Sequence, residues 1–142
     1  MGDELSELGL LELLSHAQFR VTSRVAAALR ERRSSLEEWR VLSLLADGEG
    51  HAMSEIAEFM LMPPPSTTKL IDRLVSTNLV YRRVDPADRR RVLVFLAARG
   101  RAAHRRLRPA VEEVIAGLDD EPLRDHIREL LRRVGSPQKQ TS

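Results

Sequence analysis

The sequence lacks cysteine and long apolar runs, and both absences exclude classes of protein. None of the 142 residues is cysteine, which excludes disulfides, thiolate nucleophiles, thiol redox switches and cysteine-ligated zinc or iron–sulfur centres. No apolar run approaches the ~18–20 residues that a membrane-spanning helix needs. The start Met1-Gly2-Asp3-Glu4 is acidic, whereas a signal peptide starts with basic residues. We therefore expect a cytoplasmic protein with no membrane partner.

The sequence also lacks the motifs of common enzymes and metal sites. It contains no glycine-rich phosphate loop, no Gly-x-Ser-x-Gly and no His-Glu-x-x-His. Its four histidines include no pair spaced three or four residues apart, so a helical metal pair is absent. Adjacent carboxylates such as Glu112 and Glu113 point about 100° apart on a helix and do not form an acid–base pair. We expect no enzyme, no cofactor and no metal; a zinc site assembled from distant histidines is the alternative.

Basic charge is concentrated in one short central segment. The whole chain has 23 basic and 21 acidic residues and a net charge of +2. Residues 1–62 carry a net negative charge, whereas residues 63–91 hold seven basic and only three acidic side chains. A local basic patch on a near-neutral protein indicates a site for a polyanion. A genome that prefers arginine codons is the alternative, because arginine supplies all but two of the basic residues.

Apolar periodicity predicts helices at both ends of the chain and in its middle. A long helix is expected from Leu5 to about Arg33. Ser35 is expected to cap the next helix, with Glu38 as its capping-box partner. Ser54 is the expected cap of a short third helix. A run of three prolines then begins a fourth helix, because proline is tolerated in a first turn.

Two short runs of β type follow the fourth helix. Asn78 is a suitable left-handed C-cap, and the runs Leu79–Val84 and Val92–Leu96 flank the polar, turn-forming segment Asp85–Arg91. This pattern predicts a hairpin with a charged tip. The order helix–helix–helix–hairpin between Leu36 and Leu96 is that of a winged helix-turn-helix.

The helix after the prolines has the composition of a DNA-recognition helix. Its first residues follow a turn and can face a groove, where small hydroxyls and a lysine suit phosphate and base-edge contacts. Free N–H groups at its start attract phosphate. An ordinary amphipathic helix with a solvated polar face is the alternative. The candidate contacts are Pro65, Ser66, Thr68, Lys69 and Arg73.

The hairpin tip carries three consecutive arginines, Arg89, Arg90 and Arg91. Like charges crowded on a turn are unfavourable unless an anion accepts them. Arginine on a narrow projection suits the minor groove of DNA, and Arg82 and Arg83 on the stem are expected to reach phosphates. A solvated turn is the alternative. The sequence therefore predicts double-stranded DNA as a partner.

The predicted fold class is mainly α, with a winged helix-turn-helix lobe, a small β-hairpin wing, and N- and C-terminal helices that form a dimerisation lobe. The expected parts are a dimerisation helix (1–34), the DNA-binding lobe (35–97), two further dimerisation helices (98–134) and a flexible tail (135–142). The outer helices carry apolar stripes too long for one small lobe to cover, which predicts a homodimer. The expected interface residues are Leu11, Leu14, Leu107, Val111, Leu118, Ile127 and Leu130.

The stretch Leu36–Arg101 resembles the multiple-antibiotic-resistance regulator (MarR) family of winged-helix transcription factors. Leu36–Leu42 resembles the family's second helix, Met62–Val80 its recognition helix, and Asp88-Arg89-Arg90 its wing signature. The resemblance implies a dimeric transcription regulator, expected to be a repressor, on a pseudo-palindromic operator. It assigns the minor-groove contact to Arg90. It assigns the recognition-helix contacts to Ser66, Thr68, Lys69 and Arg73.

The sequence departs from the family pattern at four positions. Pro63 and Pro65 stand where the family often has serine, so the helix start lacks a hydroxyl cap and a hydroxyl contact to DNA that the family pattern implies. Ala97 stands where the family usually has a capping threonine, and Arg91 stands where it has a small residue. The wing is therefore more basic than is typical, and the fold is retained.

The resemblance also implies a small-molecule effector, because many relatives bind aromatic molecules where the two lobes meet. His16, Phe19 and Arg20 on the first helix and Trp39 on the second suit a phenolic or carboxylate ligand. Core packing for Trp39 and surface positions for the others are the alternatives. Without cysteine, the peroxide-sensing thiol of some relatives cannot operate. Two other functions stay open: an effector-independent or architectural DNA-binding protein, and a winged-helix module that binds protein.

Overall fold

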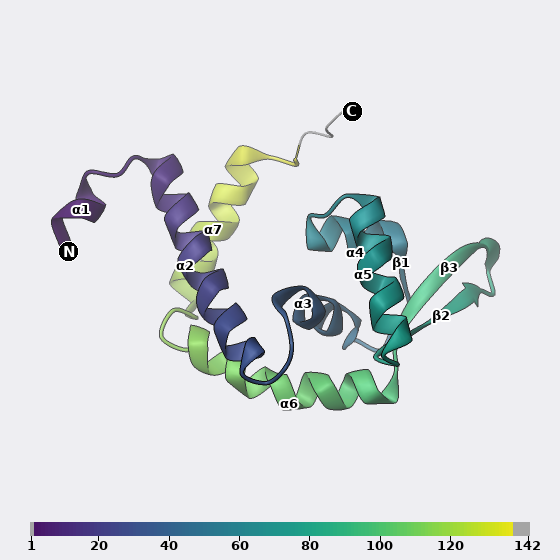
Figure 1. The fold of residues 1–142 in the computed structure, drawn as a ribbon. Helices are drawn as coiled ribbons and strands as arrows, with labels where there is room; N and C mark the ends of the chain where they lie inside the picture. Colours follow the sequence, from purple (N-terminus) through teal and green to yellow (C-terminus); the bar gives the residue numbers. More distant parts are fainter. Residues whose placement is uncertain (1, 138–142) are drawn as a thin grey trace.

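The computed structural model describes residues 2–137. These residues form, in order, α1 (Gly2–Ser6), α2 (Leu10–Arg30), α3 (Leu36–Leu45), β1 (His51–Ala52), α4 (Met53–Met60), α5 (Pro64–Ser76), β2 (Val80–Asp85), β3 (Asp88–Leu96), α6 (Ala98–Ile115) and α7 (Glu121–Val134). In Figure 1, α4, α5 and the strands lie at one end, α2 and α7 lie at the other, and α6 runs between them. Among the described residues, no helix is long and apolar enough to cross a membrane. The predicted mainly α fold with a small wing is confirmed.

The first helix is broken, so the prediction of one continuous helix is wrong. A short α1 ends at Ser6, and α2 begins only at Leu10. Gly9 between them is the N-cap of α2 in an extended conformation, with φ −71° and ψ 168°. Glycine loses more backbone entropy in a helix than any other residue, which favours a break at this position.

The caps of α3 and α4 follow the predictions only in part. Ser35 caps α3 as predicted, because its Oγ accepts the N–H of Glu38 at 3.1 Å. The Glu38 carboxylate completes no capping box; it accepts instead from the hydroxyl of Ser34. Helix α4 begins one residue before Ser54, and Ala52 is its N-cap without a side-chain bond. The backbone of Ala52 is held by its pairing in β1, so α4 starts from the sheet and not from a hydroxyl cap.

Helices α4 and α5 form the helix-turn-helix. The guanidinium of Arg40 donates to the carbonyl oxygens of Phe59 (2.9 Å) and Met60 (3.2 Å). These carbonyls end α4 and have no partner within the helix. As predicted, α5 begins in the proline run, with Pro64 as its first residue. Asn78 follows α5 with φ 62°, as predicted for a left-handed cap.

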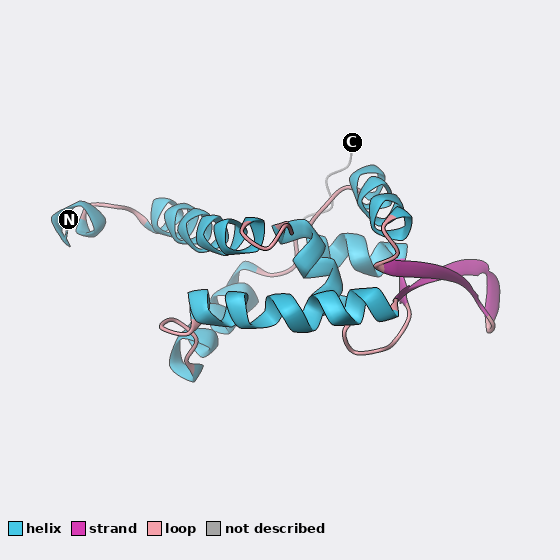
Figure 2. Cartoon of the chain, turned by 60° about the horizontal axis from the view of Figure 1, so that its bottom comes forward, coloured by secondary structure: helices cyan, strands magenta, loops and turns pink. Residues whose placement is uncertain are grey.

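The sheet has three strands, although periodicity predicts two. Strand β1 pairs antiparallel with β3, which also pairs antiparallel with β2, so the order is β1-β3-β2. A strand of two residues is too short to leave an alternating pattern, which is why β1 escapes prediction. The hairpin of β2 and β3 projects from the body of the protein as the wing (Figure 2).

The wing arginines lie on a strand and not on a loop as predicted. Strand β3 already begins at Asp88, so it includes Arg89–Arg91. The register pairs Val84 with Val92 and then Asp85 with Asp88, which leaves the three arginines without partners on β2. Such extra residues in one strand form a bulge, and bulges redirect side chains.

One buried apolar cluster contains residues from α2, α3, α4, α5, α6 and the sheet. Its fully buried members include Leu29, Leu42, Leu45, Ile56, Ile71, Leu74, Val94 and Leu107. Two residues predicted for the dimer interface, Leu107 and Val111, belong to this cluster, with exposed fractions of 0% and 8%. Helix α6 packs on α2 and α3, so this part of its stripe is covered within the protomer. The prediction is therefore wrong for these two residues, because almost all of their surface is covered within the protomer.

Helix α7 and the first half of α2 leave apolar side chains in solvent. No residue of α7 is buried, although Leu123, Ile127, Leu131 and Val134 recur at helical spacing. Of the other predicted interface residues, Leu11, Leu14, Leu118 and Ile127 are exposed and Leu130 is half-buried. Of the predicted tail 135–142, residues 138–142 lie outside the described residues.

Replacing Gly100 with alanine tests the packing of α6 on the winged lobe. A Cβ there would lie 2.1 Å from the carbonyl oxygen of Leu79 and 2.6 Å from Cδ1 of Leu96. Because α6 must shift, we expect the free energy of unfolding to fall by about 1–3 kcal/mol, the usual cost of overpacking. The control Gly117→Ala meets nothing within 4 Å and should not destabilise. Chemical denaturation measures both, and a Gly100→Ala protein as stable as wild type would contradict this packing.

Candidate nucleic-acid interface

Helix α5 presents a polar face to solvent at its beginning. Leu70, Ile71 and Leu74 bury the opposite face, and the hydroxyl of Thr67 is turned inward to donate to the Pro63 carbonyl at 3.1 Å. Because these residues are buried, the neighbouring side chains of α5 face solvent. The five predicted contacts, Pro65, Ser66, Thr68, Lys69 and Arg73, are all exposed.

The exposed residues of α5 differ in how free their polar groups are. The Thr68 hydroxyl donates to the Pro64 carbonyl at 3.0 Å, so only its lone pairs are available to an outside donor. Ser66, Lys69 and Arg73 line a shallow hollow that Glu37 of α3 also borders. Two cationic side chains therefore lie along this edge of α5 next to one carboxylate.

Two of the five predicted wing arginines are held by carboxylates of the helix-turn-helix. Arg82 on β2 forms an ion pair with Asp72 of α5. Arg91 on β3 forms one with Glu55 of α4, at 2.6 Å. Each pair joins one strand of the wing to one helix, so these two arginines position the wing. The prediction that Arg82 extends toward a phosphate misses this pairing.

The other three wing arginines are free to meet an anion. The Arg90 side chain is 94% exposed, and its only ion pair among the described residues is a long one, 3.5 Å to Asp88. Arg83 and Arg89 are exposed and have no ion-pair partner within residues 2–137. The wing therefore offers three guanidinium groups on the same hairpin.

His51 lies between two carboxylates beside the wing. Its Nε2 is 2.8 Å from Asp47 and its Nδ1 is 3.1 Å from Glu55. Burial lowers the pKa of His51, but the hydrogen bonds and charges of the two carboxylates outweigh burial and raise the pKa above its ordinary value. Burial raises the pKa of Asp47, but hydrogen bonds from the Glu49 N–H and His51, with the charge of His51, lower it overall. Because Glu55 also holds Arg91, this cluster connects β1, α4 and the wing.

The four residues predicted for an effector pocket do not share one cleft. His16, Phe19 and Arg20 are exposed on α2, and Phe19 borders a groove of ≈330 Å³ between α2 and the start of α3. Trp39 lies elsewhere, stacked on His104 of α6 with ring centroids 4.9 Å apart. The pKa of His104 is lowered, mainly by burial and also by the charge of Arg108. Within the described residues, no group of three metal-ligating side chains is assembled.

Sequence reasoning misses the carboxylates that organise this surface. Asp72 and Glu55 lie ten and 36 residues from the arginines that they hold. No local spacing rule connects such residues, because the pairs depend on how the hairpin folds back on the helices. The only signal in the sequence is the acidic character of these residues: Asp72 lies within the basic segment, and Glu55 lies before it.

The comparisons with known proteins agree with this geometry. Residues 35–91, from the N-cap of α3 to the wing arginines, match the MarR family. The HTH-type transcriptional regulator MhqR of Bacillus subtilis (strain 168) is 26% identical over 137 residues, which is 94% of each chain.

Two solved structures share the fold over most of the chain. CouR from Rhodococcus jostii RHA1 bound to p-coumaroyl-CoA has a TM-score of 0.78 and 26% identity, covering 88% of this chain and 90% of that one. The transcriptional repressor CouR bound to a 23-mer DNA duplex has a TM-score of 0.74 and 29% identity, covering 92% and 94%.

The cluster around His51 predicts a pH dependence of stability. Because the folded-state pKa of His51 is raised, its contribution is fully present below its unfolded pKa of about 6.5 and is lost as pH rises through the folded value. We expect His51→Gln to reduce the free energy of unfolding more at about pH 6 than at about pH 9. Denaturant titrations at both pH values measure the difference. His126→Gln, on exposed α7, is the control; an equal loss for His51→Gln at both pH values would refute the coupling.

Proposed function

Since the chain belongs to the MarR family of winged-helix transcription regulators, we propose that it is a homodimeric repressor that binds a pseudo-palindromic operator. The observation that carries this proposal is the exposed polar start of α5 beside three free arginines, Arg83, Arg89 and Arg90, on the wing. A helix of this kind suits the major groove, and arginines on a hairpin suit the adjacent minor groove. The DNA-bound structure of the repressor CouR supports this arrangement. Because the target would be the chromosome, the proposal also implies a cytoplasmic protein.

The exposed apolar side chains of α2 and α7 support dimerisation through the two ends of the chain. Leu11 is 73% exposed and Ile127 is 48% exposed. Exposing apolar stripes of this length to water is unfavourable in a monomer. A second copy would cover the same stripes by two-fold symmetry. Two recognition helices would then meet half-sites about one helical turn apart, which makes the operator a rough palindrome.

A small phenolic or carboxylate molecule is the proposed effector. Structures of relatives support it, since CouR binds p-coumaroyl-CoA. The groove beside Phe19 lies where α2 meets α3, between the two ends of the molecule. A ligand there would release DNA by favouring a dimer whose recognition helices are wrongly spaced. A regulator without an effector would show neither thermal stabilisation nor release from DNA in a screen of phenolic compounds.

The assembly is tested by placing a charge on the apolar face of α7. We expect wild type to sediment with twice the mass of one chain at micromolar concentration. Ile127→Asp should raise the dimer dissociation constant at least about 100-fold, since two buried copies at more than about 1.4 kcal/mol each act together. Leu61→Asp is the control, because Leu61 is 77% exposed in the α4–α5 turn. A wild-type monomer, or an Ile127→Asp dimer of unchanged affinity, would disprove the interface.

The DNA contacts are tested by comparing Arg90→Ala with Lys69→Ala. Arg90 is assigned to the minor groove, where it reads width and potential more than base identity. Its loss should weaken binding to all duplexes by a similar factor, about 1–2 kcal/mol per site, and reduce the salt slope. Lys69 is assigned to the major groove, so its loss should cost about 1–3 kcal/mol of discrimination at the contacted base pair.

The measurement is a binding titration at two salt concentrations, with an operator selected from random duplexes and a scrambled duplex. Arg105→Ala is the control, because Arg105 is an exposed residue of α6 and belongs neither to the helix-turn-helix nor to the wing. If Arg90→Ala binds like wild type, the wing assignment fails. If Lys69→Ala weakens both duplexes equally, the recognition-helix assignment fails. A protein-binding module would bind no operator and would keep its partner after the wing charges are removed.

A further inference from the structure

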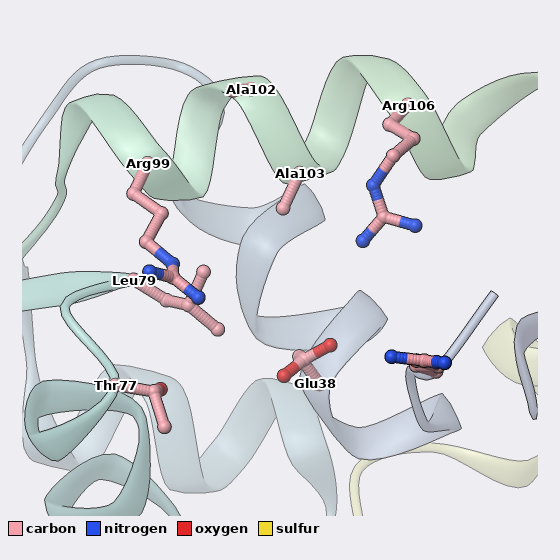
Figure 3. Close-up of a pocket in the computed structure, with 8 residues that line it drawn as sticks. Glu38, Thr77, Leu79, Arg99, Ala102, Ala103 and Arg106 are labelled. Atoms are coloured by element: carbon pink, nitrogen blue, oxygen red, sulfur yellow. The ribbon is translucent and has the colours of Figure 1, made fainter.

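A hollow of ≈450 Å³ lies on the surface between α6, α3 and the end of α5. Three arginines border it: Arg33 from the turn between α2 and α3, and Arg99 and Arg106 from α6. Leu79 and Ala103 supply apolar lining. Figure 3 shows Arg99 and Arg106 extending from α6 toward the hollow, with Glu38 on its other side. This hollow is separate from the groove beside Phe19 and from the exposed face of α5.

The arginines of this hollow are not neutralised by the protein. Within the described residues, neither Arg33 nor Arg99 has an ion-pair partner. Arg106 donates to a neutral acceptor, the carbonyl oxygen of Arg32, at 3.0 Å. Glu38 is the one carboxylate among the lining residues, and its hydrogen bond comes from the Ser34 hydroxyl. Three positive charges therefore face one negative charge in a concave site, which attracts anions.

The backbone of Arg33 gives a second, independent indication. Arg33 has φ 58°, in the left-handed region, where it follows the end of α2 and the N–H of Ser34 donates to the Leu29 carbonyl at 2.9 Å. Glycine or asparagine is the usual residue at such a helix end, because a larger side chain is strained there. Strained residues are enriched at ligand-binding sites, and of the three described non-glycine residues with positive φ, Arg33 is the one that lines this hollow. An arginine at this position supplies a guanidinium group to the hollow, and a glycine could not.

We propose that this hollow binds a small molecule with at least two negative charges, carried by phosphate or carboxylate groups. Arg33 and Arg99 hold the anionic groups, and Arg106 adds a third donor. Leu79 and Ala103 accommodate the carbon part of the ligand. Because Arg33 belongs to the turn after α2 while Leu79 follows α5, a bound anion connects the two ends of the molecule. This proposal does not depend on the DNA-binding one, because neither the exposed face of α5 nor the wing lines the hollow.

The test is calorimetric titration of the full chain at low ionic strength, with inorganic pyrophosphate in one arm and citrate in the other. We expect saturable binding of one anion per chain. Arg99→Gln and Arg33→Gly should each weaken it at least about tenfold, whereas Arg105→Gln, an exposed α6 arginine outside the hollow, should stay within about twofold. Binding of pyrophosphate alone assigns phosphate ligands, binding of citrate alone assigns carboxylates, and binding of both assigns dianions in general; each supports the site.

Thermal unfolding separates loss of binding from loss of fold. Because glycine relieves the left-handed strain, Arg33→Gly without ligand should unfold at the same temperature as wild type or higher, yet pyrophosphate or citrate should no longer raise it. No saturable binding by wild type, or equal binding by all three variants, overturns the proposal. If the anion binds as expected while no duplex is bound at any salt concentration, the proposed DNA-binding function fails and the anion site stands.

Discussion

The point at which the wing leaves the body depends on a close approach between α6 and the chain that follows α5. The N–H of Ala97 donates to the carbonyl oxygen of Leu79 at 3.0 Å, and Gly100 brings the first turn of α6 against the same carbonyl. Leu79 immediately precedes β2, so this contact fixes where the wing leaves the body. Because α6 then extends to the other end of the molecule, it also fixes the distance between the wing and the apolar faces of α2 and α7.

Ion pairs divide the basic segment into a structural and an available part. Arg82 is held by Asp72 and Arg91 by Glu55, which orients both strands of the wing on the helix-turn-helix. Exposed pairs of this kind add about 0–1 kcal/mol to stability, so their main effect is on orientation. The arginines that remain free lie on the bulge of β3 and on the outer part of β2. One of the three acidic residues of this segment, Asp72, and one from outside it, Glu55, therefore determine which arginines remain available to an anion.

Local sequence signals were sufficient to predict interactions between residues that lie close together in the chain. The cap of Ser35, the proline start of α5 and the left-handed Asn78 are all decided within four residues, and all three are confirmed. Two predictions failed because periodicity does not say what covers a stripe: Leu107 and Val111 face the protomer's own α2 and α3. In the candidate site, too, local features could be predicted and contacts between distant segments could not. Exposure of the α5 residues could be read from the sequence, whereas the partners of Arg82 and Arg91 come from segments ten and 36 residues away.

The weakest part of the isolated protomer is α7, and this links folding to assembly. Ordering its backbone costs about 1–2 kcal/mol per residue, and no residue of α7 is buried to offset that cost. Its arginines pair with Asp119, Glu121, Asp125 and Glu129, but exposed helix pairs compensate only a small part of such a cost. Burial of the stripe that contains Ile127 and Leu131 is the remaining favourable contribution, and it requires another surface. The orientation of α7 is therefore set by whatever covers that stripe, and in the proposed dimer the same contact would set, through α6, the separation of the two recognition helices.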